Sequence, residues 1–158
     1  MRMGRITLLA TGERLVSGGV RAFDPVIREL LQAARREIQL AIYRFDESAA
    51  PLLDLLEQAA ARGVRVLMVV SAIPSQPPGI RERLERLRSR PGIRVVDFEA
   101  AGGGLLHAKV IVADRERAVI GSANLTWGGL VRNHEVGVLI EGSEVWEIAR
   151  LVDRLAIP

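Results

Sequence analysis

The chain has 158 residues, of which 49% are apolar and 26% charged, and its formal net charge is +3 at pH 7. These values are typical of one globular domain with a sizeable core, in which residues 1–22 could form a short N-terminal extension. The absence of cysteine excludes disulfides and thiolate metal sites. No apolar run reaches the roughly 18 residues of a membrane span, and the N-terminal apolar stretch is too short for a signal peptide. We therefore expect a cytoplasmic protein without stable membrane insertion.

The first half of the chain alternates between patterns typical of strands and of helices. Asp24 followed by Pro25 indicates the start of a helix, and Ser48 and Gly63 are suitable caps for a second one. The apolar run at 64–70 is typical of a strand that is covered on both faces. The expected elements are strand 6–9, helix 24–36, strand 38–45, helix 48–62, strand 64–70 and helix 80–88.

Short strands dominate the second half. The polar turn at 114–116 predicts a hairpin, and Trp146 is expected in the core because it lies on an amphipathic final helix. The expected elements are strands 93–98, 106–113, 118–120 and 136–140, a loop or short helix at 125–130, and helix 143–155. Together these patterns predict an α/β fold (an α+β sandwich), with a mixed sheet and helices on both faces.

The rare polar residues of the chain gather in one segment. Lys109 is the only lysine beside 21 arginines, and both histidines and both asparagines lie between positions 107 and 134. A single lysine among arginines indicates a position that suits a compact ammonium rather than a planar guanidinium. Histidine can transfer protons or act as a nucleophile near neutral pH, so this segment is where we expect the chemistry.

Alternation along strands predicts which of these side chains share a face. Residues two apart point to the same side of a strand, which pairs His107 with Lys109, Ser122 with Asn124, and Asn133 with Glu135. The predicted hairpin places Ser122 and Asn124 opposite His107 and Lys109, with a register uncertain by about one residue. A strand that returns from Glu135 would complete one polar patch.

That patch suits a phosphate group. Lys109 would supply positive charge, Ser122 a hydroxyl and Asn124 an amide N–H. His107 could attack phosphorus, and Glu135 could accept a hydrogen bond from the second ring nitrogen of His107. Because the ammonium and the amides would stabilise the developing charge, we expect neither a metal ion nor another cofactor.

The run HAKVIVADRERAVIGSAN, from His107 to Asn124, fits the pattern H-x-K-x4-D-x6-G-S-x-N. This pattern resembles the signature of the phospholipase D superfamily, with Asp114 and Gly121 at the remaining fixed positions. Asn133 and Glu135 resemble the family's downstream residues, and residues 42–45 resemble its first strand. The resemblance covers roughly residues 24–156.

The resemblance implies a phosphodiesterase that acts without a metal ion through a covalent phosphohistidine. Family members combine two copies of the motif in one site, whereas this chain has one copy, so we expect a two-fold homodimer in which the two His107 side chains meet. Asp114 is expected to support the catalytic residues structurally. Small single-motif members are similar to bacterial endonucleases, so DNA cleavage is the expected function. The alternatives are a phospholipid phosphodiesterase of the cardiolipin type and a nucleic-acid-binding module without turnover.

Other residues retain two interpretations. Tyr43 is expected near the site by the resemblance, and Trp127 could either stack on a base of the substrate or pack in the core. His134 is expected to be structural or at the rim, although a zinc site that combines it with His107, Asp114 and Glu135 is conceivable from the residue types. The arginines between 81 and 90 form either a solvated helix face or a track for a nucleic-acid backbone.

Overall fold

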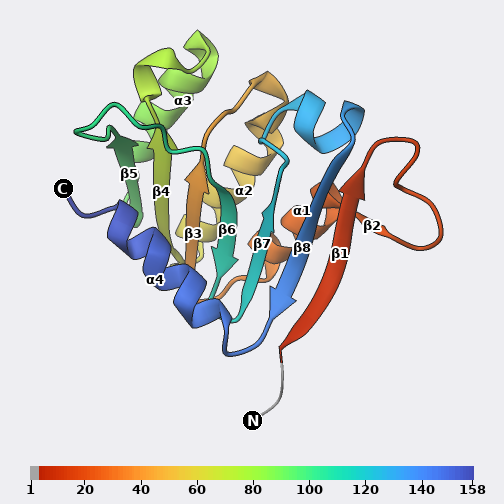
Figure 1. Cartoon of the computed structure of the whole chain (residues 1–158). Helices are drawn as coiled ribbons and strands as arrows, with labels where there is room; N and C mark the ends of the chain where they lie inside the picture. The colour runs from red at the N-terminus through yellow and green to blue at the C-terminus, as the bar shows by residue number, and fades with distance from the viewer. Residues whose placement is uncertain (1–3) are drawn as a thin grey trace.

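The structure is a computed structural model that describes residues 4–158. A single eight-stranded sheet, in the order β2-β1-β8-β7-β6-β3-β4-β5, extends across it (Figure 1). The strands are β1 (Arg5–Thr11), β2 (Arg21–Ala22), β3 (Glu37–Ile42), β4 (Arg65–Ser71), β5 (Ile93–Phe98), β6 (Lys109–Ala113), β7 (Arg117–Gly121) and β8 (Glu135–Glu141). The α-helices are α1 (Phe23–Ala33), α2 (Ala50–Ala61), α3 (Pro78–Arg88) and α4 (Val145–Leu155), and the short turns are η1 (Glu47–Ala49), η2 (Ile73–Ser75) and the π-helical η3 (Gly128–Arg132).

The sheet is mixed, as the sequence predicts. β3, β4 and β5 are parallel, whereas β6, β7, β8 and β1 run antiparallel to their neighbours from β3 outward. α1 and α2 lie behind the sheet in Figure 1 and α4 lies in front of it. The predicted arrangement of helices on both faces is therefore confirmed.

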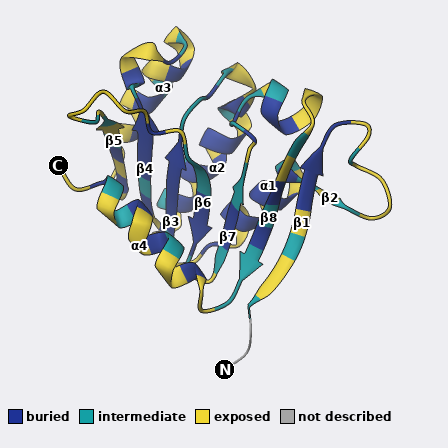
Figure 2. Ribbon diagram, viewed as in Figure 1, coloured by how far each residue is buried: buried dark blue, intermediate teal, exposed yellow. Residues whose placement is uncertain are grey.

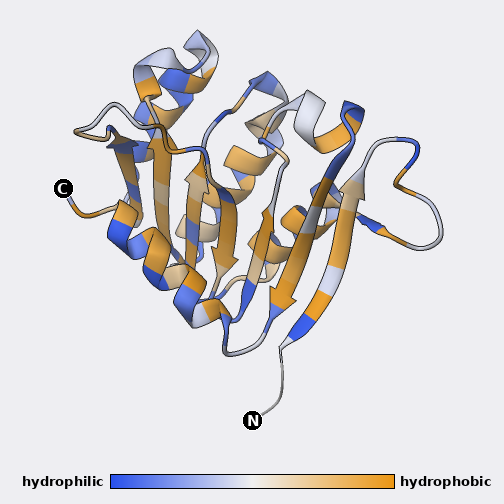
Figure 3. Ribbon diagram, in the orientation of Figure 1, coloured by the Kyte–Doolittle hydropathy of each residue, from blue (hydrophilic) through white to orange (hydrophobic). Residues whose placement is uncertain are grey.

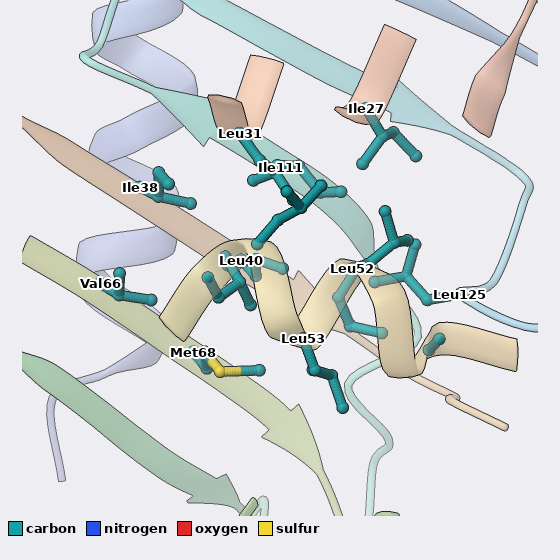
Figure 4. Packing of buried hydrophobic residues seen from close by; sticks show 14 of the residues in the cluster. Ile27, Leu31, Ile38, Leu40, Leu52, Leu53, Val66, Met68, Ile111 and Leu125 are labelled. Atoms are coloured by element: carbon teal, nitrogen blue, oxygen red, sulfur yellow. The ribbon is translucent and has the colours of Figure 1, made fainter. Parts of the chain in front are cut away.

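The main core lies between the sheet and helices α1, α2 and α3. Leucines and isoleucines of α1 and α2 point at the buried face of β3, β4 and β6 (Figure 4). The apolar positions of the helices recur at helical spacing, so each helix buries one side, whereas the central strands β3 and β4 are buried on both faces. Phe23, at the start of α1, packs directly over Gly121 and Gly137 of the neighbouring strands β7 and β8.

On the opposite face, α4 covers only part of the sheet. Val145 and Ala149 of α4 pack on Val112 and Ala118 of β6 and β7. Ile140 of β8 also packs against this cluster, but no helix among the described residues covers β1 on this side. Figures 2 and 3 show exposed segments of β1 that are also hydrophobic. This open apolar face consists of Ile6, Leu8, Ile120, Val136 and Val138.

Several boundaries differ from those expected from the sequence. The first helix ends at Ala33 and follows Ala22 rather than a capping Asp24, and the second is preceded by η1, where Asp46 caps instead of Ser48. The strand expected from residue 106 begins at Lys109. None of the helices in residues 4–158 is long and apolar enough to cross a bilayer.

The N-terminal segment is part of the sheet rather than an extension of it. β1 pairs along its whole length with β8 and also pairs with β2, a strand that the sequence pattern did not predict. The first three residues of the expected extension lie outside the described residues. The described chain thus shares one sheet from β1 to β8.

Candidate active site

The polar residues of the motif come together where four strands begin or end. β3 ends at Ile42, opposite the first residue of β6, Lys109. β7 ends at Gly121, and β8 begins two residues before Gly121's partner, Gly137. Because β6 and β8 run antiparallel to β3 and β7, all four ends lie at the same edge, which is the upper edge of the sheet in Figure 1.

His107 and Lys109 are in direct contact at this edge. The ammonium of Lys109 lies 2.9 Å from Nδ1 of His107 and donates to the His107 carbonyl oxygen at 2.8 Å. Tyr43, the residue after β3, places its ring centroid 4.4 Å from that of His107 and 5.4 Å from the Lys109 nitrogen. Tyr43 therefore supports the imidazole and the ammonium together. The imidazole remains exposed.

Burial lowers the pKa of Lys109 below its ordinary value, although the negative charge of Glu135 and the nearby Tyr43 raise it in the opposite direction. Losing water destabilises the ammonium, and a nearby carboxylate partly restores it. A phosphate would supply the anionic partner that this partly desolvated cation lacks.

Ser122, Glu135 and Asn133 form a second cluster. The Ser122 hydroxyl donates to the Glu135 carboxylate, and the Asn133 amide reaches the other carboxylate oxygen at 3.4 Å. The Ser122 backbone N–H donates to Val136 O at 3.1 Å, which ties the end of β7 to the start of β8. The expected pairing of Glu135 with His107 is not formed, because Ser122 and Asn133 engage the carboxylate while Lys109 lies against Nδ1.

The expected register of the hairpin holds to within one residue. Val110 pairs with Ile120, and extending this pairing places Ser122 opposite Ala108, between His107 and Lys109. The pairing stops at Lys109 and Gly121, however, so the side chains of Ser122 and Asn124 are positioned by β8 and by η3 rather than by β6.

Asn124 sits beneath η3 with its amide unpaired. Its Oδ1 atom is buried and has no hydrogen-bond partner among the described residues. Gly129 packs on the Asn124 backbone so closely that a Cβ on Gly129 would be 2.3 Å from Asn124 O. The unpaired Oδ1 atom can only accept a hydrogen bond, so the part of this amide that could donate to a phosphate oxygen is the Nδ2 group.

Asp114 lies at the opposite end of β6. The length of this strand separates it from Lys109 by roughly 16 Å along the sheet. Its carboxylate accepts hydrogen bonds from the backbone N–H groups of Arg35, Arg36 and Glu37, at 2.7–3.3 Å. Asp114 and Arg115 both have φ of 56°, as a tight hairpin turn with two left-handed residues requires. The motif aspartate thus anchors the segment between α1 and β3 and does not reach the other motif side chains.

The two remaining candidates lie on either side of η3. Trp127 is 50% exposed, so it does not pack in the core. His134 is exposed, and its Nε2 accepts the backbone N–H of Arg14 at 3.4 Å. A zinc site that combines His107, His134, Glu135 and Asp114 is not formed, because Asp114 lies at the far end of the strand.

Most arginines of the 81–90 segment belong to a solvated helix face. Arg83 pairs with Asp54 and Glu57, Arg88 with Glu85, and Arg90 with Glu57.

Trp146, expected in the core, is 55% exposed and lies under the guanidinium of Arg115, 4.8 Å from its carbon. The apolar periodicity of α4 did not reveal that Trp146 is exposed. Periodicity shows which side of a helix is apolar, but not how much of that side contacts the sheet.

Three residues near the site gave no signal in the sequence. Asp46 accepts the Trp127 backbone N–H at 2.9 Å, Arg44 lies 5.0 Å from the Tyr43 ring, and Arg132 lies 6.0 Å from the Trp127 ring. Each has a common residue type in a chain rich in arginine, and only the neighbours in space distinguish them.

Residues 27–155 match the family described as "Cardiolipin synthase, PLD-like domain". The DISARM protein DrmC of Bacillus paralicheniformis is 29% identical over 151 residues, which cover 93% of this chain and 61% of that protein. The human 5'-3' exonuclease PLD3 is 35% identical over 89 residues, which cover 56% of this chain and 18% of that protein. The chain thus spans about three fifths of the first relative and about a fifth of the second.

Solved structures show the same fold. NucT from Helicobacter pylori superposes with a TM-score of 0.77 at 18% identity, over 97% of this chain and 96% of that one. The phospholipase D family member Nuc from Salmonella typhimurium also gives 0.77, at 20% identity over 97% and 94% of the two chains. The family match over residues 27–155 covers most of the chain, which also carries the complete motif, so the chain belongs to the phospholipase D superfamily.

Proposed function

We propose that this protein is a metal-independent phosphodiesterase that cleaves nucleic acid, with DNA as the expected substrate, through a covalent bond between His107 and phosphorus. The observation that carries this proposal is the 2.9 Å contact between Lys109 and His107 at the edge where Ser122, Asn124 and Glu135 also gather. The exonuclease among the relatives supports a nucleic-acid substrate.

The contact with Lys109 determines which nitrogen of His107 carries the proton. An ammonium can only donate, so Nδ1 accepts and the proton of the neutral imidazole lies on Nε2. Attack requires a lone pair on Nε2. A phosphate oxygen that binds Lys109 would compete for the ammonium, free Nδ1 to hold the proton, and expose the Nε2 lone pair to phosphorus.

The reaction then proceeds in two displacements. In the first, the N–P bond forms, the P–O bond to the leaving group breaks, and an acid gives its proton to the leaving oxygen. In the second, water attacks phosphorus, its proton returns to the group that acted as the acid, and the N–P bond breaks. Lys109, Ser122 and the Asn124 amide would stabilise the non-bridging oxygens in both steps, in place of a metal ion.

A second copy of this chain is the source that we propose for the acid, with its own His107 at the shared site. The open apolar face supports such a homodimer. Pairing register aligns Leu8, Val138 and Ile120 in one row, and Leu8 is 62% exposed. Val136, at 56% exposed, continues the face to the start of β8, beside the site. Contiguous exposed apolar surface of this kind is typical of interfaces.

Replacing Leu8 with arginine tests the dimer. We expect Leu8→Arg to sediment as a monomer and to lose cleavage, because the charge would be buried at the interface. Val16→Arg is the matched control, since Val16 is also an exposed apolar residue of the N-terminal segment but lies outside the open apolar face. A Leu8→Arg protein that stays dimeric and active would contradict the proposed interface.

The same exposed apolar surface also favours a second candidate, a phospholipid substrate of the cardiolipin type. One experiment separates the two: single-stranded DNA, duplex DNA, RNA and cardiolipin vesicles are incubated with the protein in excess EDTA, with His107→Ala in parallel. EDTA-resistant cleavage of nucleic acid that disappears in the variant supports the nuclease. Hydrolysis of the lipid alone supports the alternative, and binding without turnover of any substrate indicates a binding module.

A further inference from the structure

Both tryptophans of the chain are exposed under an arginine, but only one of them lies near the site. Trp127 is 50% exposed with Arg132 at 6.0 Å from its ring, and Trp146 is 55% exposed with Arg115 at 4.8 Å. Arg115 is held by Glu37 and Asp153 in ion pairs, so its contact with Trp146 belongs to the protein's own packing. Arg132 makes no ion pair or side-chain hydrogen bond with any residue in 4–158.

The backbone beneath Trp127 is held in place from two directions. Its N–H donates to Asp46, whose other carboxylate oxygen accepts the Ser48 backbone N–H at 3.0 Å. Two residues earlier, Leu125 bridges to Phe45, three residues after the end of β3. The backbone that carries the exposed ring is thus held in place. Because little ordering of this backbone is needed on binding, the loss of conformational entropy is small.

Trp127 is also next to the catalytic cluster. Trp127 follows Asn124 by three positions, so their Cα atoms are at most about 11 Å apart. The following residue, Gly128, packs against the Asn133 side chain, with a distance of 3.3 Å from its Cβ position to Asn133 Nδ2. Asn133 in turn contacts Glu135. The backbone beside Trp127 is thus in contact with the cluster of Asn133, Glu135 and Ser122.

We propose that Trp127, flanked by the free cation of Arg132, is a stacking platform for an unpaired base next to the cleaved phosphodiester, and that it makes the protein selective for single-stranded nucleic acid. This inference rests on the proposed nuclease function and names its substrate class. An exposed indole stacks on any base with its face free, whereas the bases of a duplex are already stacked on one another. Arg132 adds a charge that can contact the neighbouring phosphate.

Fluorescence can test the platform without relying on catalysis. The chain has two tryptophans, so Trp146→Phe leaves Trp127 as the sole reporter. With His107→Ala added to prevent cleavage, we expect single-stranded oligothymidylate to quench this fluorescence, and a blunt duplex of the same length to quench it much less. Trp127→Phe, which retains only Trp146, is the matched control and is expected to show no quenching.

The affinity for single-stranded DNA should depend on the indole of Trp127. We expect Trp127→Ala to lose about 5- to 150-fold in affinity for the single strand, equivalent to about 1–3 kcal/mol, and to retain its affinity for the duplex. In cleavage assays of the single strand the loss should appear in KM more than in kcat. Trp146→Ala should match the parent protein in both assays.

Three results would overturn the platform. They are equal quenching by duplex and single strand, dissociation of a dimer on Trp127→Ala, and a response of Trp127 to cardiolipin vesicles but not to oligothymidylate. Hydrolysis of bis(p-nitrophenyl) phosphate by the parent protein distinguishes these failures from failure of the proposed function. If the parent hydrolyses this small diester and cleaves DNA while Trp127→Ala binds single strands normally, only the platform is wrong.

Discussion

The ammonium of Lys109 lies 2.9 Å from Nδ1 of His107, while the Tyr43 ring contacts both groups. This pairing explains why the only lysine of the chain is at this position. A compact ammonium can approach both the imidazole nitrogen and the His107 carbonyl oxygen, and it can rotate toward a phosphate. A guanidinium is planar and larger, and its donors are fixed in one plane.

Lys109→Arg should therefore lower kcat/KM for DNA by about 100- to 1,000-fold, the usual effect of removing one donor that stabilises a developing anion. Steady-state cleavage of a single-stranded oligonucleotide would measure it. Because the charge is retained, any loss reports geometry rather than electrostatics. Full activity in the variant would show that the identity of this cation does not matter, and it would remove the reason given for the lone lysine.

Tyr43 should act through its ring and not through its hydroxyl. The hydroxyl makes no hydrogen bond with residues 4–158, whereas the ring centroid is 4.4 Å from that of His107. We expect Tyr43→Phe to keep most of the activity and Tyr43→Leu to lose about 10- to 100-fold in kcat, because a small displacement of a nucleophile is costly. Similar losses in both variants would instead assign a role to the hydroxyl.

The sequence predicted the class of fold, and the motif residues that it grouped lie near one another except for Asp114. The turn at Asp114 predicted the hairpin of β6 and β7, whose ends at Lys109 and Gly121 lie at one edge, but β8 and η3 position Ser122 and Asn124. β5 was predicted with both of its ends, since Ile93–Phe98 is bounded by clear turn residues.

The features that the sequence did not predict are determined by contacts between segments far apart in the sequence. β1 pairs with β8, across more than a hundred residues, and no local pattern in the N-terminal segment indicates this partner. The partners of Glu135 likewise depend on which side chains surround it, and Ser122 and Asn133 lie closer to it than His107 does in the folded chain. Trp146 was wrongly predicted in the core, because helical periodicity shows which side of α4 is apolar but not how far the sheet extends beneath that side.

Asp114 should matter for stability rather than for chemistry. Burial raises the pKa of its carboxyl, but the backbone N–H groups of Glu37, Arg35 and Arg36 outweigh this and hold the pKa below its ordinary value. Asp114→Ala should lower the free energy of unfolding by about 1–3 kcal/mol, because it leaves these donors unpaired. Asp114→Asn should lose less, since asparagine also tolerates a positive φ and retains an acceptor. Denaturant unfolding measures both, and single-turnover cleavage below the melting range should stay close to that of the parent.

The pH dependence of this effect has a defined sign. A carboxylate whose pKa is depressed on folding contributes stability above its unfolded pKa of about 3.9, and the contribution is lost as pH falls through the lower folded pKa. The stability difference between the parent protein and Asp114→Asn should therefore be constant between pH 5 and 7 and shrink below about pH 4. A difference that grows on acidification would contradict the assignment.

Gly121, the glycine of the motif, is explained by Phe23 rather than by the substrate. A Cβ at Gly121 would lie 2.8 Å from Phe23 Cζ and 2.8 Å from the Cα of Gly137 on the next strand. Gly121→Ala should therefore destabilise the fold by about 1–3 kcal/mol, since an overpacked core must shift. Gly102→Ala is the matched control, because a Cβ there meets nothing within 4 Å, and its effect should stay within about 0.5 kcal/mol. If Gly121→Ala instead unfolds like the parent protein but loses cleavage, the glycine serves the approach of the substrate to the backbone and not the packing of α1 on the sheet.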